Sequence, residues 1–327
     1  MGCFAAMDES LKTQNAEAAP VLWLVADDRP GHRNQLAGVA NWMRELAGVH
    51  CEWLPAPTSR LRAMLWRLLR RFPPGEGKPA PHWILVAGER THWAGLAARR
   101  AAGGRLIVLM RPSLPYGWFD LCCVPQHDEP PTRPNVLPTL GVANAVRAPV
   151  ARKPGRVLIL LGGPSRHHGW DTAAVTAQVC EIVRRTPHLH FTIADSRRTP
   201  PQALSTVCAA AKTWASGGLE AMPVDQAPKG WLVDTLSRTA TVWVTADSVS
   251  MLYEAATAGA AVGVLSVPMR RRGRKRALRA QELATEVGLA TTFARWRKAH
   301  KLPQPAFPLQ EAQRIAQALL MRFPDRG

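Results

Sequence analysis

The residues with the most chemical potential are concentrated in one stretch, residues 241–259. Its pattern predicts a short buried strand, a tight turn and a helix that ends at a glycine. Asp247 or Ser248 can cap this helix by accepting a hydrogen bond from a free amide of its first turn. Asp247, Ser250 and Glu254 are expected on one helical face, because seven residues make nearly two full turns. A strand that leads into such a helix N-terminus is typical of a ligand site in an α/β domain.

Two further loops of the C-terminal half could hold phosphate groups. Gly162 and Gly163 open the loop that includes Ser165, and without a Cβ their amides can approach a phosphate closely. The loop is not a Walker A motif, since no Gly-Lys-Ser/Thr follows. Arg197 and Arg198 precede a predicted helix, where a guanidinium could clamp a diphosphate. The alternatives are a simple tight turn for the glycines and a solvated basic loop for the arginines.

Glu254 is a candidate for contact with a ribose. Its carboxylate can accept hydrogen bonds from two vicinal hydroxyls. The alternative is a surface glutamate on an exposed helix face.

The densest polar loop of the N-terminal half lies between residues 27 and 35. Either Asp27 or Asp28 could act as a base there, and His32 is the natural proton carrier near neutral pH. The alternative is a polar loop in which Asp28 caps a helix.

The grouping of Ser165, His167, His168 and Asp171 invites a hydrolase interpretation, which we reject. The sequence has no G-x-S-x-G elbow, and neighbours in sequence rarely form a catalytic triad. The two histidines are expected to be loop or substrate-contact residues.

Alternating strands and helices must position these side chains. Apolar runs predict strands over 21–25, 49–53, 83–87, 106–110 and 121–124, and again over 156–161, 190–194, 241–245 and 261–267. Helical periodicity predicts helices between them, including a basic amphipathic helix over 59–72. This alternation indicates an α/β protein with parallel, helix-covered sheets, so we expect two Rossmann-like domains that face each other across a cleft.

A proline-rich segment, residues 125–155, breaks the periodicity and predicts a domain boundary. We expect a disordered tail over 1–19, an N-terminal domain over 20–148 and a C-terminal domain over 149–305. Residues 306–327 are expected to form a helix that packs back on the N-terminal domain.

The charge of the chain implies an acidic partner. Its 327 residues are 46% hydrophobic, enough for a sizeable core, and carry a net charge of +18. Nucleotide phosphates, anionic lipid headgroups or nucleic acid would suit this charge, although a solvated basic surface explains part of it. The helix over 59–72 could rest on an anionic membrane. Nucleic-acid binding through residues 270–279 is not expected, because no reader motif or aromatic interleaving is present there.

The sequence does not favour a membrane-spanning, metal-binding or disulfide-bonded protein. No apolar run approaches the roughly 18 residues of a spanning helix, and the first twenty residues do not resemble a signal peptide. The six cysteines form no C-x-x-C pair and no paired Cys/His spacing. We therefore expect no metal, no cofactor and a reducing cytoplasmic location.

Four motifs together resemble the mitochondrial fission ELM (elongated mitochondria) family, of which bacterial members are common. The motifs are Asp27–Gln35, Leu161–Pro164, Ser196–Pro200 and Thr245–Met251, within residues 21–267. The resemblance implies a GT-B-like architecture of two Rossmann-like domains. Bacterial members are treated as glycosyltransferases of cell-envelope sugars, and the plant member is associated with division of mitochondria.

The resemblance also implies roles for individual residues. In nucleotide-sugar transferases of the GT-B type, a Ser/Thr-rich turn and a helix glutamate hold the donor ribose, and the matching stretch here lacks one hydroxyl at Ala246. The implied co-substrate is a nucleotide-diphosphate sugar. Its expected ligands are Gly162, Gly163, Ser165, Arg197, Arg198, Asp247, Ser248, Ser250 and Glu254, and those of the acceptor are Arg29, Gln35 and Arg111.

The expected reaction is displacement at the anomeric carbon of the donor sugar, with His32 or Asp28 removing the acceptor proton. Amides and arginines, rather than a metal, would stabilise the leaving diphosphate. The protein would be cytoplasmic and peripheral on the inner face of the membrane, where it would meet a lipid-linked acceptor. The alternative function is a non-catalytic, membrane-associated scaffold or nucleotide-binding adaptor with the same fold.

Overall fold

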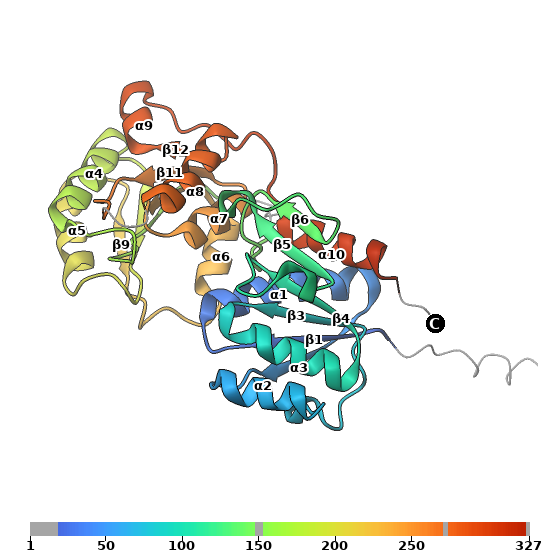
Figure 1. The fold of residues 1–327 in the computed structure, drawn as a ribbon. Coiled ribbons are helices and arrows are strands. Elements are labelled where there is room, and N and C mark those ends of the chain that lie inside the picture. The colour runs from blue at the N-terminus through green and yellow to red at the C-terminus, as the bar shows by residue number, and fades with distance from the viewer. Residues whose placement is uncertain (1–18, 148–152, 271–273, 325–327) are drawn as a thin grey trace, which may run out of the picture. The chain divides into compact units, whose positions relative to one another are not determined.

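The computed structural model describes residues 19–147, 153–270 and 274–324 (Figure 1). The described residues divide into two compact units: those up to Cys122 together with those from Arg314 onward, and Cys123–Gln313. The predicted tail over 1–19 lies outside the described residues except for Ala19. The basic block over 270–279 also falls partly outside them.

The first sheet contains six strands in the order β2-β1-β3-β4-β5-β6. The strands are β1 (Val21–Ala26), β2 (His50–Pro55), β3 (Trp83–Ala87), β4 (Arg105–Leu109), β5 (Leu121–Pro125) and β6 (Val136–Thr139). β1 pairs in parallel with β2 and β3, and β3 pairs in parallel with β4. Every residue of β1, β3 and β5 is buried, as in parallel sheets covered by helices on both faces.

The sequence did not predict β6, which lies inside the proline-rich segment. The first sheet therefore continues to Thr139, whereas the compact units divide after Cys122. The domain boundary expected at residue 148 stays a prediction.

The helices of this half are α1 (Pro30–Ala47), α2 (Arg60–Leu68) and α3 (His92–Ala102). α1 has a proline at its start and ends at Gly48, which has a left-handed backbone conformation. α2 is shorter than the predicted helix over 59–72. Ser59 caps it, and the chain turns away after Leu68, with φ of 53° at Arg70.

The second sheet contains six strands in the order β12-β11-β10-β7-β8-β9, and all neighbouring strands are parallel. The strands are β7 (Lys153–Leu160), β8 (His190–Ala194), β9 (Leu219–Met222), β10 (Thr239–Thr245), β11 (Ala261–Leu265) and β12 (Thr291–Thr292). The sequence missed β9 and β12 because neither is a buried apolar run. β9 is half-exposed, and β12 has only two residues.

The helices of the second half follow the predicted alternation. They are α4 (Thr172–Arg185), α5 (Ala203–Lys212), α6 (Trp231–Arg238), α7 (Val249–Thr257), α8 (Arg274–Glu286) and α9 (Phe293–Ala299), and α10 (Glu311–Arg322) closes the described chain. α9 was not predicted as a helix. It supplies Phe293 and Trp296, whose rings pack edge-on against Trp243 of β10.

The strand order reverses once in each sheet. The first chain segment runs from β1 outward to β2 and then returns to β3 on the other side of β1. The second runs from β7 outward through β8 and β9 and returns to β10 beside β7. Such reversals are the switch points at which open α/β sheets bind ligands, outside the carboxyl ends of the strands. The two Rossmann-like halves predicted from the sequence are therefore confirmed, and each has one such point.

Two negative findings hold for the described part of the chain. None of its helices combines the length and the apolar character needed to cross a membrane. Within the same residues, no three His, Cys, Asp or Glu side chains lie close enough together to hold a metal ion.

Candidate functional site

The switch point of the second sheet is built around the carboxylate of Asp247. This residue follows β10, and its side chain is fully buried. Its Oδ2 atom accepts hydrogen bonds from the amide of Gly163 (3.0 Å) and from Nη2 of Arg198 (2.7 Å). Asp247 thus joins the loop after β10 to the loops after β7 and β8.

Glycine is required at two positions of this junction. A Cβ atom at Gly162 would overlap with the carboxylate of Asp247, and one at Gly163 would overlap with the backbone carbonyl of Arg198. From the sequence we expect the lack of side chains at these two glycines to leave room for a phosphate. In the structure, protein atoms occupy that room.

Further hydrogen bonds close the junction from all three loops. The Gly162 amide donates to Oγ1 of Thr245 (2.7 Å), and its carbonyl accepts from Oγ of Ser196 (3.0 Å). Nη1 of Arg198 donates to the carbonyl of Gly163 (2.8 Å). Both glycine amides expected to bind phosphate therefore donate to side chains of the protein, so a phosphate contact through them would require an exchange of bonds.

Arg197 and Arg198 differ in their surroundings. Arg198 is committed to Asp247 and to two carbonyl groups of the glycine loop, although 41% of its side chain remains exposed. Arg197 is exposed at the surface. An anion approaching this loop would therefore meet one guanidinium held by the protein, that of Arg198, and an exposed one, that of Arg197.

Ser165 organises its own loop. Its Oγ accepts from the amides of His167 (3.3 Å) and His168 (3.1 Å), and its amide donates to the carbonyl of His168 (2.9 Å). Burial lowers the pKa of His168 and outweighs the opposing effect of the nearby Asp247 carboxylate. Asp171 caps α4 by accepting from the amide of Ala174 (3.0 Å). Oγ of Ser165 also lies 3.5 Å from Nδ1 of His168, but Asp171 serves as the helix cap, so Ser165, His168 and Asp171 do not form a triad.

α7 differs from its sequence expectation in one respect. Ser248 is its cap and accepts from the amide of Met251 (3.4 Å), so Asp247 precedes the helix. Asp247 faces inward and does not share a helical face with Ser250, which is exposed, or with Glu254, which is half-buried. The expectation of one continuous polar face is corrected, because helical spacing does not extend through the turn before the cap.

The switch point of the first sheet holds a histidine–aspartate pair. Asp27 directly follows β1, and His32 lies in the first turn of α1. Nδ1 of His32 is 2.9 Å from Oδ1 and 3.0 Å from Oδ2 of Asp27. Both side chains are mostly but not fully buried. Since an ionised carboxylate only accepts, Nδ1 of His32 is the donor in this pair, and in the neutral ring Nε2 would then carry the lone pair.

Neighbouring backbone fixes this pair. The amide of Arg29 donates to Oδ1 of Asp27 (3.2 Å). Gly88, which follows β3, packs so close to the His32 ring that a Cβ there would overlap with it, and its φ of 90° also favours glycine. Asp28, the expected alternative base, is exposed. The structure thus brings together His32 and Asp27, and not His32 and Asp28.

The expected acceptor ligands occupy different environments. Arg29 and Arg111 are exposed, whereas Gln35 is buried one turn after His32 in α1. The Oε1 atom of Gln35 is a buried acceptor for which the described residues provide no donor.

The sequence analysis missed His92, a buried histidine at the start of α3. Its Nδ1 accepts from the amide of Ser113 (3.3 Å) and lies 2.9 Å from the Ser113 hydroxyl. Burial lowers the pKa of His92 to about 4 and outweighs the attraction of Glu89. The ring is therefore neutral near pH 7. The only sequence signal was a histidine shortly after the β3 run.

Comparisons with known proteins identify the family and the fold of the chain. A family model described as "Mitochondrial fission ELM1" matches residues 30–323. An uncharacterized protein of Rickettsia prowazekii (strain Madrid E) is 22% identical over 297 residues, which cover 73% of this chain and 81% of that protein.

Solved structures resemble the chain over nearly its whole length. The UDP-GlcNAc 2-epimerase of Methanocaldococcus jannaschii has a TM-score of 0.57 at 11% identity, with 92% of this chain and 99% of that chain covered. A UDP-glucosyltransferase of Polygonum tinctorium has a TM-score of 0.50 at 14% identity (94% and 96% covered). A glycosyltransferase of Rickettsia africae has a TM-score of 0.50 at 8% identity (95% and 100% covered). This likeness shows the GT-B fold that the sequence predicts.

We expect Asp247→Asn to destabilise the second unit by about 1–3 kcal/mol, because the amide nitrogen would be buried without an acceptor and the charge that holds Arg198 would be lost. Chemical denaturation measures this change. Asp171→Asn is the matched control, because asparagine caps helices about as well as aspartate. Equal stability of Asp247→Asn and the wild type would contradict the structural role given to this carboxylate.

The stability of the first unit should fall as the pH falls below about 6.5. In the unfolded chain a histidine binds its proton near pH 6.5, whereas the folded state resists protonation of His92 until about pH 4. His92 should therefore cost about 2 kcal/mol of stability between pH 7 and pH 5. His92→Gln should remove that part of the pH dependence in denaturation curves. If the stability of the variant and that of the wild type changed with pH in parallel, His92 would be excluded as the source of this pH dependence.

Proposed function

The chain belongs to the Mitochondrial fission ELM1 family, and from this premise we propose that it is a glycosyltransferase that uses a nucleotide-diphosphate sugar and a cell-envelope acceptor. The observation that carries the proposal is the His32–Asp27 pair at the switch point of the first sheet. An oriented imidazole at a ligand-binding edge has the geometry of a general base. The names of similar structures, a UDP-GlcNAc 2-epimerase and a UDP-glucosyltransferase, support a nucleotide sugar as the ligand.

His32 acts as the base in this proposal, with Asp27 as its orienting partner. Asp27 holds the proton on Nδ1, so Nε2 accepts the proton of the acceptor hydroxyl. The carboxylate then stabilises the imidazolium that forms. The acceptor oxygen forms a bond to the anomeric carbon of the sugar, and the bond from that carbon to the diphosphate oxygen breaks. Arg29, Gln35 and Arg111 are the proposed acceptor contacts.

The second unit binds the donor nucleotide in this proposal. Ser248, Ser250 and Glu254 would contact the ribose, and Arg197, with the exposed part of Arg198, would neutralise the leaving diphosphate. The loop of Gly162, Gly163 and Ser165 shapes the phosphate side of the site. Asp247 is buried, so we assign it a positioning role: it holds Arg198 and Gly163 in place.

One observation favours the non-catalytic adaptor as a second candidate. The amides of Gly162 and Gly163 and the guanidinium of Arg198 already have partners inside the protein. A site whose phosphate-binding groups are satisfied in this way could bind a nucleotide without accelerating its reaction. The two candidates differ in turnover, not in nucleotide binding.

Donor binding should raise the melting temperature of the protein in the presence of one of the UDP-, GDP-, ADP- or CMP-linked sugars. At about a hundredfold excess over Kd, a ligand adds about 2.7 kcal/mol of stability. Glu254→Ala should abolish this shift, because the ribose loses its carboxylate acceptor. Glu286→Ala, an exposed glutamate on α8, is the control and should keep it. If no nucleotide sugar stabilises the wild type, donor binding is refuted.

His32→Gln should lower the rate of sugar transfer by about 10²–10⁴-fold, as expected for loss of a general base. Asp27→Asn should also lower it strongly, because an amide can stabilise the wrong tautomer of the imidazole. Asp28→Asn should stay near the wild-type rate. Nucleotide release gives the rates, and mass spectrometry of the sugar product distinguishes transfer from epimerisation.

The donor-induced melting shift should persist in the His32→Gln and Asp27→Asn variants, since neither residue contacts the donor nucleotide in the proposal. A loss of rate in Asp28→Asn with none in Asp27→Asn would reverse the assignment of the orienting partner. Donor binding by the wild type without turnover of any acceptor tested would favour the adaptor.

A further inference from the structure

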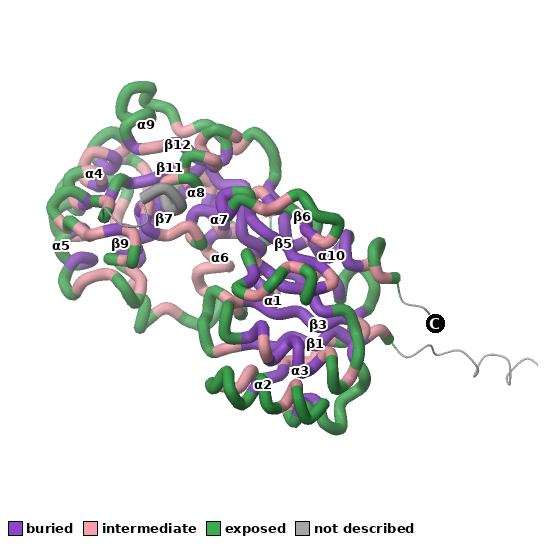
Figure 2. The backbone as a smooth tube through the Cα atoms, viewed as in Figure 1, coloured by how far each residue is buried: buried purple, intermediate pink, exposed green. Residues whose placement is uncertain are grey.

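Helix α2 turns its more apolar side away from the protein. Leu61, Leu65 and Leu68 recur at helical spacing and form one stripe, with exposed fractions of 77%, 51% and 77%. Ala63, on the opposite side, is buried. Figure 2 shows α2 exposed over most of its length. An amphipathic helix on a folded core normally turns its apolar stripe inward. The leucine stripe of α2 instead faces outward and is not covered by the core.

The apolar surface extends beyond the stripe. Met64 adds to it within α2, and Leu69 adds to it directly after the helix, with exposed fractions of 39% and 56%. Trp118, on a short turn of the same unit, is also partly exposed. A cluster of exposed apolar residues rimmed by polar ones marks an interaction surface rather than ordinary surface composition.

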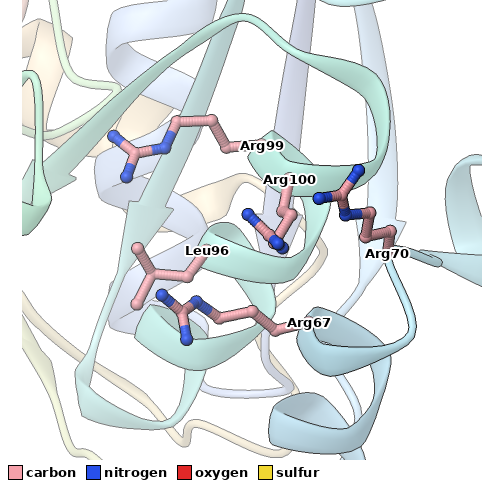
Figure 3. A pocket seen from close by; sticks show the side chains of 5 residues that line it. All are labelled: Arg67, Arg70, Leu96, Arg99 and Arg100. Atoms are coloured by element: carbon pink, nitrogen blue, oxygen red, sulfur yellow. The ribbon is translucent and has the colours of Figure 1, made fainter.

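Arginines gather next to this apolar surface. A cavity of about 300 Å³ is lined by Leu96 and by four arginines, Arg67, Arg70, Arg99 and Arg100. Figure 3 shows Arg67 on α2 and Arg70 just after the end of this helix, while Leu96, Arg99 and Arg100 come from α3. α2 and α3 pack directly against each other, so the cavity lies beside the helix that carries the leucine stripe, and Arg70 directly follows Leu69 in the chain.

The charge of the cavity is only partly compensated. Arg99 pairs with Asp120 (3.0 Å), and Arg67 stacks over the rings of Trp93 and Trp118. Among the described residues, no acidic side chain forms an ion pair with Arg70 or Arg100. Like charges held around one cavity favour an anion with several acceptor oxygens, which guanidinium groups bind through paired hydrogen bonds.

We propose that this surface docks the protein on an anionic phospholipid bilayer. The leucine stripe of α2 enters the boundary between headgroups and acyl chains, and the arginine cavity takes a lipid phosphate. Exposed leucines beside arginines and a tryptophan match the chemistry of an interfacial helix. A nucleic acid would use the arginines but not the leucines, since its bases stack on aromatic rings. The docking does not depend on the proposed transferase chemistry.

The test is co-sedimentation of the full chain with vesicles of phosphatidylcholine alone and of phosphatidylcholine mixed with phosphatidylglycerol, at low and high salt. Binding should require the anionic lipid and weaken with salt. Arg70→Gln with Arg100→Gln should weaken it roughly fivefold for each arginine. Leu65→Ser with Leu68→Ser should weaken it about tenfold or more, because these side chains lose their burial in lipid.

Matched controls separate a specific surface from the general positive charge of the chain. Arg184→Gln on α4 removes an exposed arginine elsewhere, and Met321→Ser on α10 removes an apolar side chain that is 75% exposed. Both should bind vesicles as the wild type does. All four variants alter exposed residues, and unchanged melting temperatures verify their folding.

Three outcomes would overturn the proposal. The first is no binding to anionic vesicles. The second is equal weakening, per arginine removed, by Arg184→Gln and by Arg70→Gln with Arg100→Gln. The third is equally tight binding to single-stranded DNA with the same dependence on Leu65 and Leu68. The melting shift with nucleotide sugars is read on the same variants. A variant that loses vesicle binding but keeps this shift separates docking from donor binding.

Discussion

The second unit depends on one buried carboxylate. A charged group with no solvent exposure is stabilised by nearby donors. Oδ2 of Asp247 has two, the Gly163 amide and the Arg198 guanidinium, whereas Oδ1 is buried with no donor among the described residues. The two donors come from loops after β7 and β8, while the acceptor follows β10. A single charge therefore sets the relative positions of three loops at the switch point. Because Gly162 packs directly on that carboxylate, the backbone must approach it closely, which explains the adjacent glycines better than phosphate binding alone.

The first unit uses a related arrangement with a different chemical result. Asp27 again follows a strand at the switch point, and a glycine from the neighbouring loop, Gly88, packs against the ring of its partner His32. Here the partner is the imidazole of His32, and the pair is not completely buried. Asp247 and Arg198 hold a fixed charge pair, whereas Asp27 and His32 leave one ring nitrogen available. Because of this physical difference, we assign a positioning role to the Asp247–Arg198 pair and propose a catalytic role for the Asp27–His32 pair.

The sequence was sufficient for the alternation of strands and helices and for both switch-point loops, because buried parallel strands appear as uninterrupted apolar runs. It was insufficient where burial is incomplete, as in β9, or where a strand has two residues, as in β12. It placed Asp247 in a ligand site but not in contact with Gly163, since the two residues are 84 positions apart. It also left Asp27 and Asp28 equivalent, because which of two adjacent carboxylates turns inward depends on how the strand ends and on the helix that follows.

Periodicity shows which residues of a helix share a face, but not which face meets the core. For α2 the two faces had to be distinguished by the structure, which buries Ala63 and exposes Leu61 and Leu68. α2 packs against α3, and a close approach of two helices favours small side chains between them. The larger apolar side chains are then left outside. In a soluble context this arrangement is unfavourable, and the arginines of the adjacent cavity repel one another as well. In the docking that we propose, an anionic bilayer would reduce both costs, because its interior is apolar and its headgroups are negatively charged.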